Sequence, residues 1–436
     1  MRTPFGIADE LSCYYDTPAE PCNVHIEVRV PGHLEEPALR QAIRAALAAQ
    51  PRALVRRAPG GRWQRRYAWE VPAHLDTDPL ATAAWTDERD LAQRRMRFLA
   101  GSPPLDSSPP LRLLLAAGPG EDRVILNAHH AALDGISCLE LLRAVAAHYP
   151  GSGDQGAGYP GTPPPDSGSR PASARRPGLL PMPATRIATD RRGGASRAGR
   201  GEQGTRSGYG FRLITFQHVP ASPQAGREPH VTVNDLLIAA LIVAIDRWNA
   251  AHGQPSSRIR ITMPVNSRLR GEAGAAGNLS RLTAVTAQLP DHGYELRSVV
   301  ADVAAQTRWA KHHPGPQVDP LMRALAAPWC PAAVKRRLLR LLLRTAGPLF
   351  CDTSLLSNLG VVTKPPRFGH VPASHLWFST SAHMPRGLSV GAVTLGGRLN
   401  VCLRYRRALF SEPAAARFTD ELTAALSQIT SLRSPQ

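Results

Sequence analysis

Two adjacent histidines stand out in the sequence because an aspartate and a glycine follow them at a fixed, short spacing. The stretch from Asn127 to Gly135 contains His129, His130 and Asp134 in the pattern HHxxxDG. A neutral imidazole can take a proton from a hydroxyl or an amine near pH 7, so one of these histidines is a candidate general base. From the frequencies of these residue types in the chain, the pattern would arise by chance on the order of once in several hundred sequences of this length.

The segments on either side of the motif predict the elements that must position it. Residues 111–117 and 123–128 are apolar runs separated by a turn rich in glycine and proline, which predicts two neighbouring strands. After Gly135 the apolar residues recur at helical spacing as far as His148. The motif is therefore expected on a strand-to-helix loop, where a rigid scaffold can present reactive side chains.

The pattern shows only in part which motif residue is catalytic and which is structural. Successive side chains of an extended segment point to opposite sides, so His129 and His130 cannot both face the same space. One is expected to be catalytic and the other structural. Asp134 directly precedes the expected helix and can be its N-cap, with Gly135 easing the turn. Cys138 lies in the first turns of that apolar-striped helix, where packing is favoured over a role as nucleophile.

Length and composition indicate a globular protein of two units. A chain of 436 residues suits two domains of roughly 150 to 220 residues each, and the 43% of apolar residues suffice for two cores. Residues 1–10 lack a basic head followed by an apolar run, and no apolar stretch is long enough to span a membrane. We therefore expect a cytoplasmic protein without stable membrane insertion. The six cysteines show no metal-ligand or redox spacing.

The net charge of +18 raises the question of nucleic acid as a partner. Only three lysines accompany the many arginines, and alanine, proline and glycine are abundant, so part of the charge reflects the codon usage of a GC-rich genome. No zinc-finger spacing, helix-turn-helix pattern or aromatic RNA-binding stripe accompanies it. The sequence therefore argues against nucleic acid as a partner, although a basic surface would attract acidic or phosphorylated molecules.

The order of the predicted elements divides the chain into three parts. Residues 1–150 alternate strands and helices. Residues 151–209 are rich in Gly, Pro, Ser and Arg and are expected to form a disordered linker, and residues 210–436 form a second mixed α/β unit. A basic amphipathic helix is expected at 335–344, with Arg336, Arg340 and Arg344 on a solvated face, and a surface for a membrane or a carrier protein is the alternative. The other expected elements are strands at 24–30, 211–216 and 258–268, the last of which ends in a polar loop, helices at 36–50, 231–252 and 412–432, and a hairpin at 388–405.

Four further short motifs follow HHxxxDG in a fixed order, and together they carry a family resemblance. The sequence resembles the condensation-domain superfamily of acyltransferases, which includes condensation domains of non-ribosomal peptide synthetases, wax ester synthase/diacylglycerol acyltransferases, polyketide-associated acyltransferases and chloramphenicol acetyltransferase. The likeness extends over most of the chain outside the linker. The further motifs are Val233-Asn234-Asp235, Met263-Pro-Val-Asn-Ser-Arg268, Gly277-Asn278 and Ser357-Asn358-Leu-Gly360.

The resemblance implies a fold and a set of roles. The fold would be α/β, with two chloramphenicol-acetyltransferase-like subdomains arranged as a V around a tunnel. His130 would be the base and His129 would support the loop, while Asp134 would pair with a buried arginine, for which Arg268 is the candidate. The donor would be a thioester of coenzyme A or of phosphopantetheine on an acyl carrier protein. The acceptor would be a small molecule, and the resemblance implies a monomer with no bound cofactor and no metal.

Acyl transfer also requires hydrogen-bond donors where negative charge develops on the carbonyl oxygen. The backbone N–H of Gly135 is one candidate, and Ser357, Asn358 and Asn234 are further candidates for the oxyanion or the substrate. With no carrier or adenylation unit in the sequence, a free-standing enzyme that acylates a hydroxyl of a lipid, polyketide or peptide is favoured. Amide formation and a catalytically silent domain that docks carrier proteins are the alternatives.

Overall fold

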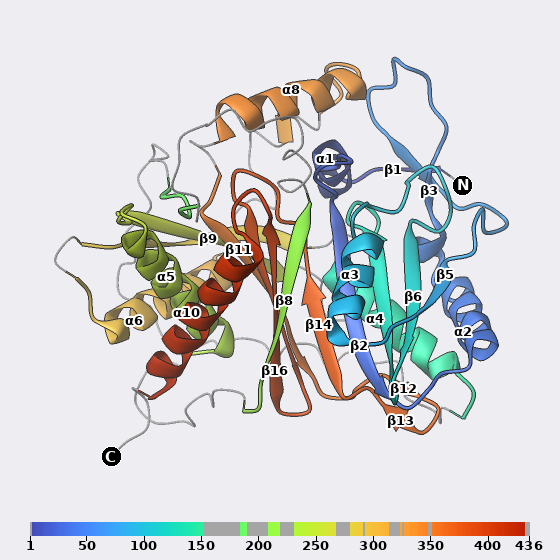
Figure 1. The fold of residues 1–436 in the computed structure, drawn as a ribbon. Coiled ribbons are helices and arrows are strands. Elements are labelled where there is room, and N and C mark those ends of the chain that lie inside the picture. Colours follow the sequence, from blue (N-terminus) through green and yellow to red (C-terminus); the bar gives the residue numbers. More distant parts are fainter. Residues whose placement is uncertain are drawn as a thin grey trace, which may run out of the picture.

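The computed structural model describes residues 2–151, 184–189, 208–218, 231–266, 280–290, 293–313, 323–324, 327–347 and 351–431. Within these residues the fold is a mixed α/β arrangement built on two mixed sheets, each covered by helices (Figure 1). The predicted α/β class is confirmed.

The first sheet carries the histidine motif and contains, among the described residues, five strands in the order β14-β2-β7-β6-β5. All neighbouring strands are antiparallel except β5 and β6, which are parallel. The strands predicted at 24–30, 111–117 and 123–128 are confirmed. The bounds are His375–Ser379 for β14, Asn23–Pro31 for β2, Glu121–His129 for β7, Leu111–Gly118 for β6 and Leu80–Ala84 for β5.

Apolar and polar residues alternate along β2, so the two faces of the first sheet have different surroundings. Its even-numbered residues are apolar and belong to a core shared with helices α2 (Glu36–Ala48) and α4 (Gly135–His148). Its odd-numbered residues from 23 to 29 are polar and lie on the opposite face, because successive side chains of a strand point in opposite directions. The apolar set is Val24, Ile26, Val28 and Val30, and the polar set is Asn23, His25, Glu27 and Arg29.

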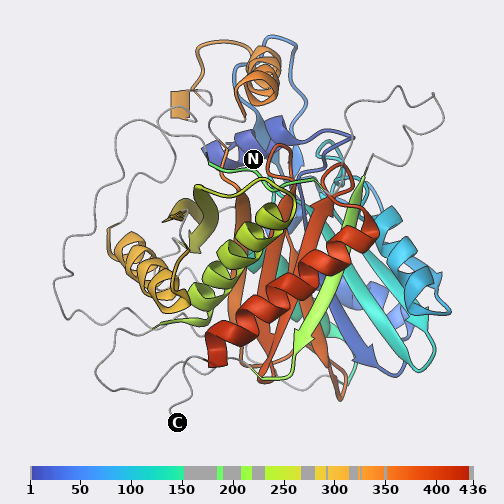
Figure 2. The same cartoon turned by 60° about the vertical axis from the view of Figure 1, so that its left-hand side comes forward.

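The second sheet contains six strands among the described residues, in the order β10-β9-β11-β15-β16-β8. Helices α5 (Val233–Ala251), α6 (Leu296–His312) and α10 (Glu412–Ser431) pack beside one another over it (Figure 2). The predicted hairpin is confirmed, and its turn glycines 396 and 397 adopt positive φ angles of 56° and 76°. The bounds are Ser280–Gln288 for β10, Arg258–Asn266 for β9, Ser354–Val362 for β11, Leu388–Leu395 for β15, Arg398–Arg406 for β16 and Tyr209–Phe216 for β8.

Strand β14 connects the two halves of the fold. It pairs with β2 in the first sheet although it lies far beyond the predicted linker in the sequence, and it also contacts β15 and β16 of the second sheet. The approach is close: a Cβ at Gly391 of β15 would lie 1.9 Å from the carbonyl oxygen of Phe378 in β14. A glycine is therefore required where the two sheets meet.

Residues 184–189 lie inside the predicted linker, yet they pack on the second unit. Ile187 and Ala188 are buried in its core. The Asn249 side chain accepts a hydrogen bond from the Ala188 N–H at 2.7 Å and donates one to the Arg186 carbonyl at 2.7 Å. Most of residues 151–209 lies outside the described residues.

The remaining elements surround the two sheets. No helix of the described chain has the length and apolarity needed to cross a membrane. The remaining bounds are Arg2–Pro4 for β1, Ile7–Tyr15 for α1, Pro51–Leu54 for a 3-10 turn, Arg56–Arg57 for β3, Ala68–Glu70 for β4, Glu88–Phe98 for α3, Ala332–Thr345 for α8, Arg367–Phe368 for β12 and Val371–Pro372 for β13.

The basic helix α8 differs from its prediction. Arg336 and Arg340 do not form a solvated face: both donate hydrogen bonds to the carbonyl of Asp16, at 2.7 and 2.9 Å. Asp16 is the C-cap of α1, where helix carbonyls lack intrahelical donors and the helix dipole favours a positive charge. Lys335 is fully buried and lies 3.6 Å from Glu10. The prediction was wrong for Arg336 and Arg340, because spacing alone does not show which face of a helix meets its neighbour, whereas Arg344 is exposed as predicted.

Candidate active site

The HHxxxDG motif occupies the loop between β7 and α4, as predicted. Strand β7 ends at His129 and helix α4 begins at Gly135. The N–H of His129 donates to the carbonyl of Pro110, and the N–H of His130 donates to the carbonyl of Cys22, both at 2.9 Å. The backbone of the two histidines is thus held between the residues that precede β6 and β2.

His129 is buried and both of its ring nitrogens face protein atoms. Its Nδ1 accepts a hydrogen bond from the N–H of Ala131 at 3.0 Å, so the proton of the neutral ring is on Nε2. That Nε2 lies 3.7 Å from Oδ2 of Asp16. These contacts orient the loop from within, and they suit a supporting residue.

Asp16 is a site residue that the sequence analysis did not single out. Burial alone would raise the pKa of its carboxyl group. The imidazole of His129, the N–H of Cys22 at 2.8 Å and the hydroxyl of Ser102 at 2.6 Å lower that pKa to about 2 instead. Asp16 follows α1 and is far from the motif in sequence, so no local signal connects the two.

His130 differs from His129 in its surroundings. It is partly buried, and it occupies the turn directly after β7. Burial lowers the pKa of its imidazole below the ordinary value, although the charge of Asp134 acts in the opposite direction. The ring is therefore neutral near pH 7, which is the state that a general base requires.

Asp134 is the N-cap of α4. Its Oδ1 accepts a hydrogen bond from the N–H of Ser137 at 2.9 Å. This is the simpler of the two roles that the sequence allowed. The other role, an ion pair with Arg268, lies outside the described residues and stays a prediction.

We expect Asp134→Ala to lower the free energy of unfolding by about 0.5–2 kcal/mol, because the cap of α4 is lost. Asp134→Asn is the matched variant, since asparagine caps as well as aspartate but carries no charge. Urea denaturation of both variants separates the two roles. If Asp134→Asn is as unstable as Asp134→Ala, capping is not its main contribution and the ion pair with Arg268 is supported.

Gly135 lies where the two halves of the fold meet. A Cβ on this residue would be 2.7 Å from the ring of Phe378 in β14 and 2.9 Å from Leu359 in β11. Both neighbours come from after the predicted linker. The N–H of Gly135 is among those at the start of α4 that have no intrahelical acceptor, and it lies at the positive end of the helix dipole.

Leu359 belongs to the Ser357-Asn358-Leu-Gly360 motif, so the structure brings this motif against the histidine loop. The register of β11 on β15 shifts after Asn358, and Gly360 has a positive φ of 81°. Oδ1 of Asn358 accepts a hydrogen bond from the N–H of Gly360 at 2.8 Å, which occupies the amide oxygen in the bulge. Ser357 is buried opposite Gly391. That Ser357 and Asn358 contact an oxyanion or the substrate stays a prediction.

The Asn234-Asp235 motif begins helix α5. Asp235 is buried, and its carboxylate accepts hydrogen bonds from the N–H of Thr232 at 2.7 Å and from the hydroxyl of Thr307 at 2.6 Å. Nδ2 of Asn234 lies 3.5 Å from the sulfur of Met263. Asp235 therefore has a structural role, while a substrate role of Asn234 stays a prediction. Residues 267–279, which include Arg268, Gly277 and Asn278, lie outside the described residues.

The remaining candidate groups do not add a nucleophile or a metal site. Cys138 is fully buried, and burial raises the pKa of its thiol well above the ordinary value, so it packs as predicted. In the part of the chain that the structure describes, no three His, Cys, Asp or Glu side chains are grouped to hold a metal ion.

Comparison with known sequences identifies close relatives. The proteins are "Uncharacterized protein MT2362" of Mycobacterium tuberculosis strain CDC 1551 and "Uncharacterized protein Rv2305" of strain H37Rv. Each is 31% identical over 427 residues, which cover 91% of this chain and 92% of the relative. No family model matches the sequence.

Comparison with solved structures identifies the fold. The wax ester synthase/diacylglycerol acyltransferase from Marinobacter aquaeolei VT8 has a TM-score of 0.60 at 13% identity and covers 98% of both chains. The first condensation domain of the CDA synthetase has a TM-score of 0.65 at 15% identity and covers 99% of this chain and 96% of its own. The starter condensation domain of rhizomide synthetase, in complex with C8-CoA and Leu-SNAC, has a TM-score of 0.62 at 13% identity and covers 98% and 94%. The chain therefore belongs to the family of the two Mycobacterium tuberculosis proteins, and its fold is the condensation-domain, chloramphenicol-acetyltransferase-like fold of wax ester synthase and the peptide synthetase domains.

Proposed function

We propose that this protein is a monomeric acyltransferase that moves an acyl group from a thioester to a hydroxyl, or to an amine, of a lipid, polyketide or peptide. The observation that carries the proposal is the partly buried imidazole of His130 on the loop between β7 and α4, where burial lowers its pKa. The fold supports it, since the structural relatives include a wax ester synthase and a condensation domain that binds C8-CoA and Leu-SNAC. By analogy, the donor is acyl-CoA or acyl-phosphopantetheine on a carrier protein.

In the proposed reaction, the imidazole of His130 accepts the proton of the acceptor hydroxyl while the oxygen attacks the thioester carbonyl. The carbon–oxygen bond forms and the carbonyl oxygen takes up negative charge. The N–H of Gly135, at the positive end of α4, donates to that oxyanion, with Ser357 or Asn358 as a further donor. His129 and Asp16 hold the loop during these steps.

Collapse of the tetrahedral intermediate completes the reaction. The carbon–sulfur bond breaks and the imidazolium of His130 returns its proton to the departing thiolate. The products are an ester and a free thiol, and the ring is neutral again. The chain needs no acyl-enzyme intermediate for this sequence. We place the reaction in a tunnel between two subdomains arranged as a V, with donor and acceptor entering from opposite sides.

The pH dependence of the reaction follows from the pKa of His130. Since burial lowers that pKa below its ordinary value of about 6.5, the neutral base persists into mildly acidic solution. We expect kcat/KM to stay constant as the pH falls from 8 to about 6.5 and to decrease only at lower pH. A profile that already decreases above pH 7 would contradict a His130 that is neutral by burial.

A panel of substrates tests the proposal directly. The purified protein is incubated with acyl-CoA donors of increasing chain length and with matched alcohol and amine acceptors. Products are identified by mass spectrometry, and thiol release is followed with a chromogenic disulfide. Acceptor-dependent thiol release with an acylated product is expected, and the acceptor class separates ester from amide formation. Absence of transfer with every donor, together with binding of a carrier protein, would instead support a silent docking domain.

A further inference from the structure

Arg404 lies in β16 on the face that meets the first sheet. The odd-numbered residues of β16 from 399 to 405 belong to the core beneath α5 and α10, so the even-numbered residues point to the other side. Arg404 is fully buried, and its Nη1 lies 3.4 Å from the carbonyl oxygen of Asn23 at the start of β2. The guanidinium is thus enclosed between the two sheets.

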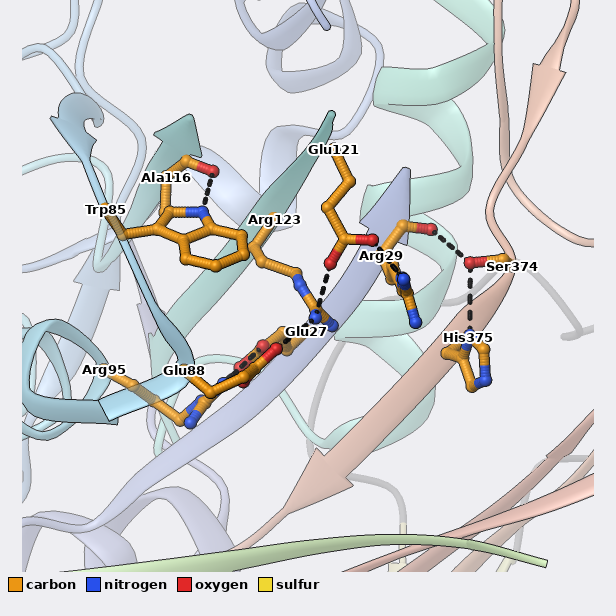
Figure 3. Close-up of polar contacts among 10 residues, drawn as sticks. All are labelled: Glu27, Arg29, Trp85, Glu88, Arg95, Ala116, Glu121, Arg123, Ser374 and His375. Atoms are coloured by element: carbon orange, nitrogen blue, oxygen red, sulfur yellow. Dashed lines mark hydrogen bonds and ion pairs between the residues drawn. The ribbon is translucent and has the colours of Figure 1, made fainter. Parts of the chain in front are cut away.

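Two other buried arginines of the described chain, Arg95 and Arg123, have carboxylate partners. Arg95 contacts Glu27 through two hydrogen bonds of 2.5 and 2.7 Å, and Arg123 lies 2.7 Å from Glu121 and 3.1 Å from Glu88, as Figure 3 shows. This is the usual rule, since a buried charge without a partner costs several kcal/mol. Arg404 departs from the rule: among the described residues, none offers its Nε or Nη2 a hydrogen-bond acceptor or a carboxylate.

Two further donors lie beside Arg404. Its guanidinium carbon is 4.4 Å from the ring centre of Tyr209, and that of Arg406 is 4.8 Å from the same ring. The hydroxyl of Tyr209 is buried beside the Arg406 guanidinium, and the described residues offer no acceptor for its proton. Arg406 donates a hydrogen bond to the carbonyl of Ala19 at 2.5 Å, and its Nε lies 3.8 Å from the carboxylate of Glu20. Burial lowers the pKa of Arg404, so a nearby anion would stabilise its charged form, and burial raises the pKa of Tyr209, which keeps its hydroxyl protonated and able to donate.

The position of the cluster relates it to the candidate base. Asn23, which Arg404 contacts, is the strand partner of His129, and the carbonyl of Cys22 accepts the N–H of His130. Partner Cα atoms of antiparallel strands lie about 5 Å apart and consecutive Cα atoms 3.8 Å apart, so the guanidinium is within about 15 Å of the His130 backbone.

We propose that Arg404, Tyr209 and Arg406 bind a carboxylate of the substrate close to the atoms that react. The inference rests on the proposed function and extends it: the acyl chain or the acceptor carries a negative charge. A planar guanidinium recognises a carboxylate through paired hydrogen bonds, and a phenol hydroxyl adds a third. The phosphates of coenzyme A are a second source of negative charge, and the experiment below distinguishes them from a carboxylate.

Matched probes test the assignment by isothermal titration calorimetry, which needs no turnover. The pairs are glutaryl-CoA and its methyl ester, 3-hydroxybutyrate and its methyl ester, and coenzyme A and pantetheine. We expect one of the two carboxylate pairs to show about tenfold or more tighter binding of the charged member. This preference should disappear in Arg404→Met, weaken in Tyr209→Phe and persist in Arg398→Met, which removes a charge elsewhere on β16.

Thermal melting without ligand supplies an independent readout. Because Arg404→Met removes a buried charge that lacks a carboxylate, we expect its melting temperature to equal or exceed that of the parent. A lower melting temperature, together with an unchanged preference in Tyr209→Phe, would make Arg404 structural and overturn the inference. A preference confined to coenzyme A over pantetheine would overturn the carboxylate assignment. If Arg404→Met loses carboxylate binding but transfers acyl groups at the parental rate, the bound carboxylate is not that of the substrate, and this inference alone is overturned. If the parent protein binds the carboxylate probes but transfers no acyl group, the result counts only against the proposed function.

Discussion

His130→Ala is expected to lower the rate of acyl transfer by about a hundredfold to ten-thousandfold, the usual contribution of a positioned general base. The side chain is partly buried on a turn, and its backbone N–H, which holds the loop to Cys22, is kept in the variant. The fold should therefore survive. Steady-state rates with the best donor and acceptor, together with a melting curve, measure both effects.

Two other histidine variants make the result specific. His129→Ala removes the acceptor of the Ala131 N–H and the neighbour of Asp16, so we expect it to lower the melting temperature. His375→Ala changes a histidine of β14 whose Nδ1 lies 3.1 Å from the hydroxyl oxygen of Ser374 (Figure 3). His375 belongs to none of the motifs of the candidate site, so this variant should keep the parental rate. Full activity in His130→Ala would refute its role as base. Equal loss of activity in His375→Ala would show a general effect of removing histidines.

Arg95→Met is expected to lower the free energy of unfolding by about 3–5 kcal/mol, because it leaves the Glu27 carboxylate buried without its partner. Both side chains of this pair are almost completely buried, and Arg95 makes two hydrogen bonds to the carboxylate (Figure 3). Burial alone would raise the pKa of Glu27, but the charge and hydrogen bonds of Arg95 lower it, so the carboxylate stays ionised in the folded protein. Urea denaturation measures the loss.

The adjacent residue of α3 provides the control. Arg94 forms a partly exposed pair with Asp90 at 3.0 Å, so Arg94→Met should change stability by about 0.5 kcal/mol or less. The double variant Arg95→Met with Glu27→Met removes both buried charges and should recover most of the lost stability. Equal stabilities of Arg95→Met and Arg94→Met would contradict a buried pair.

Much of the secondary structure was predictable because it depends on neighbours in the sequence. Alternating apolar residues predicted β2, apolar runs on either side of a turn predicted β6 and β7, helical spacing predicted α4 and α5, and two glycines predicted the turn between β15 and β16. The position of HHxxxDG between a strand and a helix followed in the same way. The chemistry of its imidazoles was predictable too, since residue type determines it.

The division of roles between the two histidines required more than spacing. Alternation showed only that they face different ways, and the resemblance implied which one is the base. The structure adds the contacts of His129 with Ala131 and Asp16, and the burial that keeps His130 neutral. Asp134 had two possible roles, the N-cap of α4 and an ion pair with Arg268. The described residues show the N-cap.

The sequence by itself determined the local elements, the histidine loop and the type of chemistry, because periodicity and residue type act over a few neighbouring residues. Only the tertiary structure decided that β14 completes the first sheet, that Arg336 and Arg340 turn inward to the end of α1, and that Arg404 is buried without a carboxylate. These contacts join residues far apart in the chain. They depend on which surfaces pack together. The burial of apolar area and the pairing of buried charges decide that packing over the whole fold, so no local pattern in the sequence shows it.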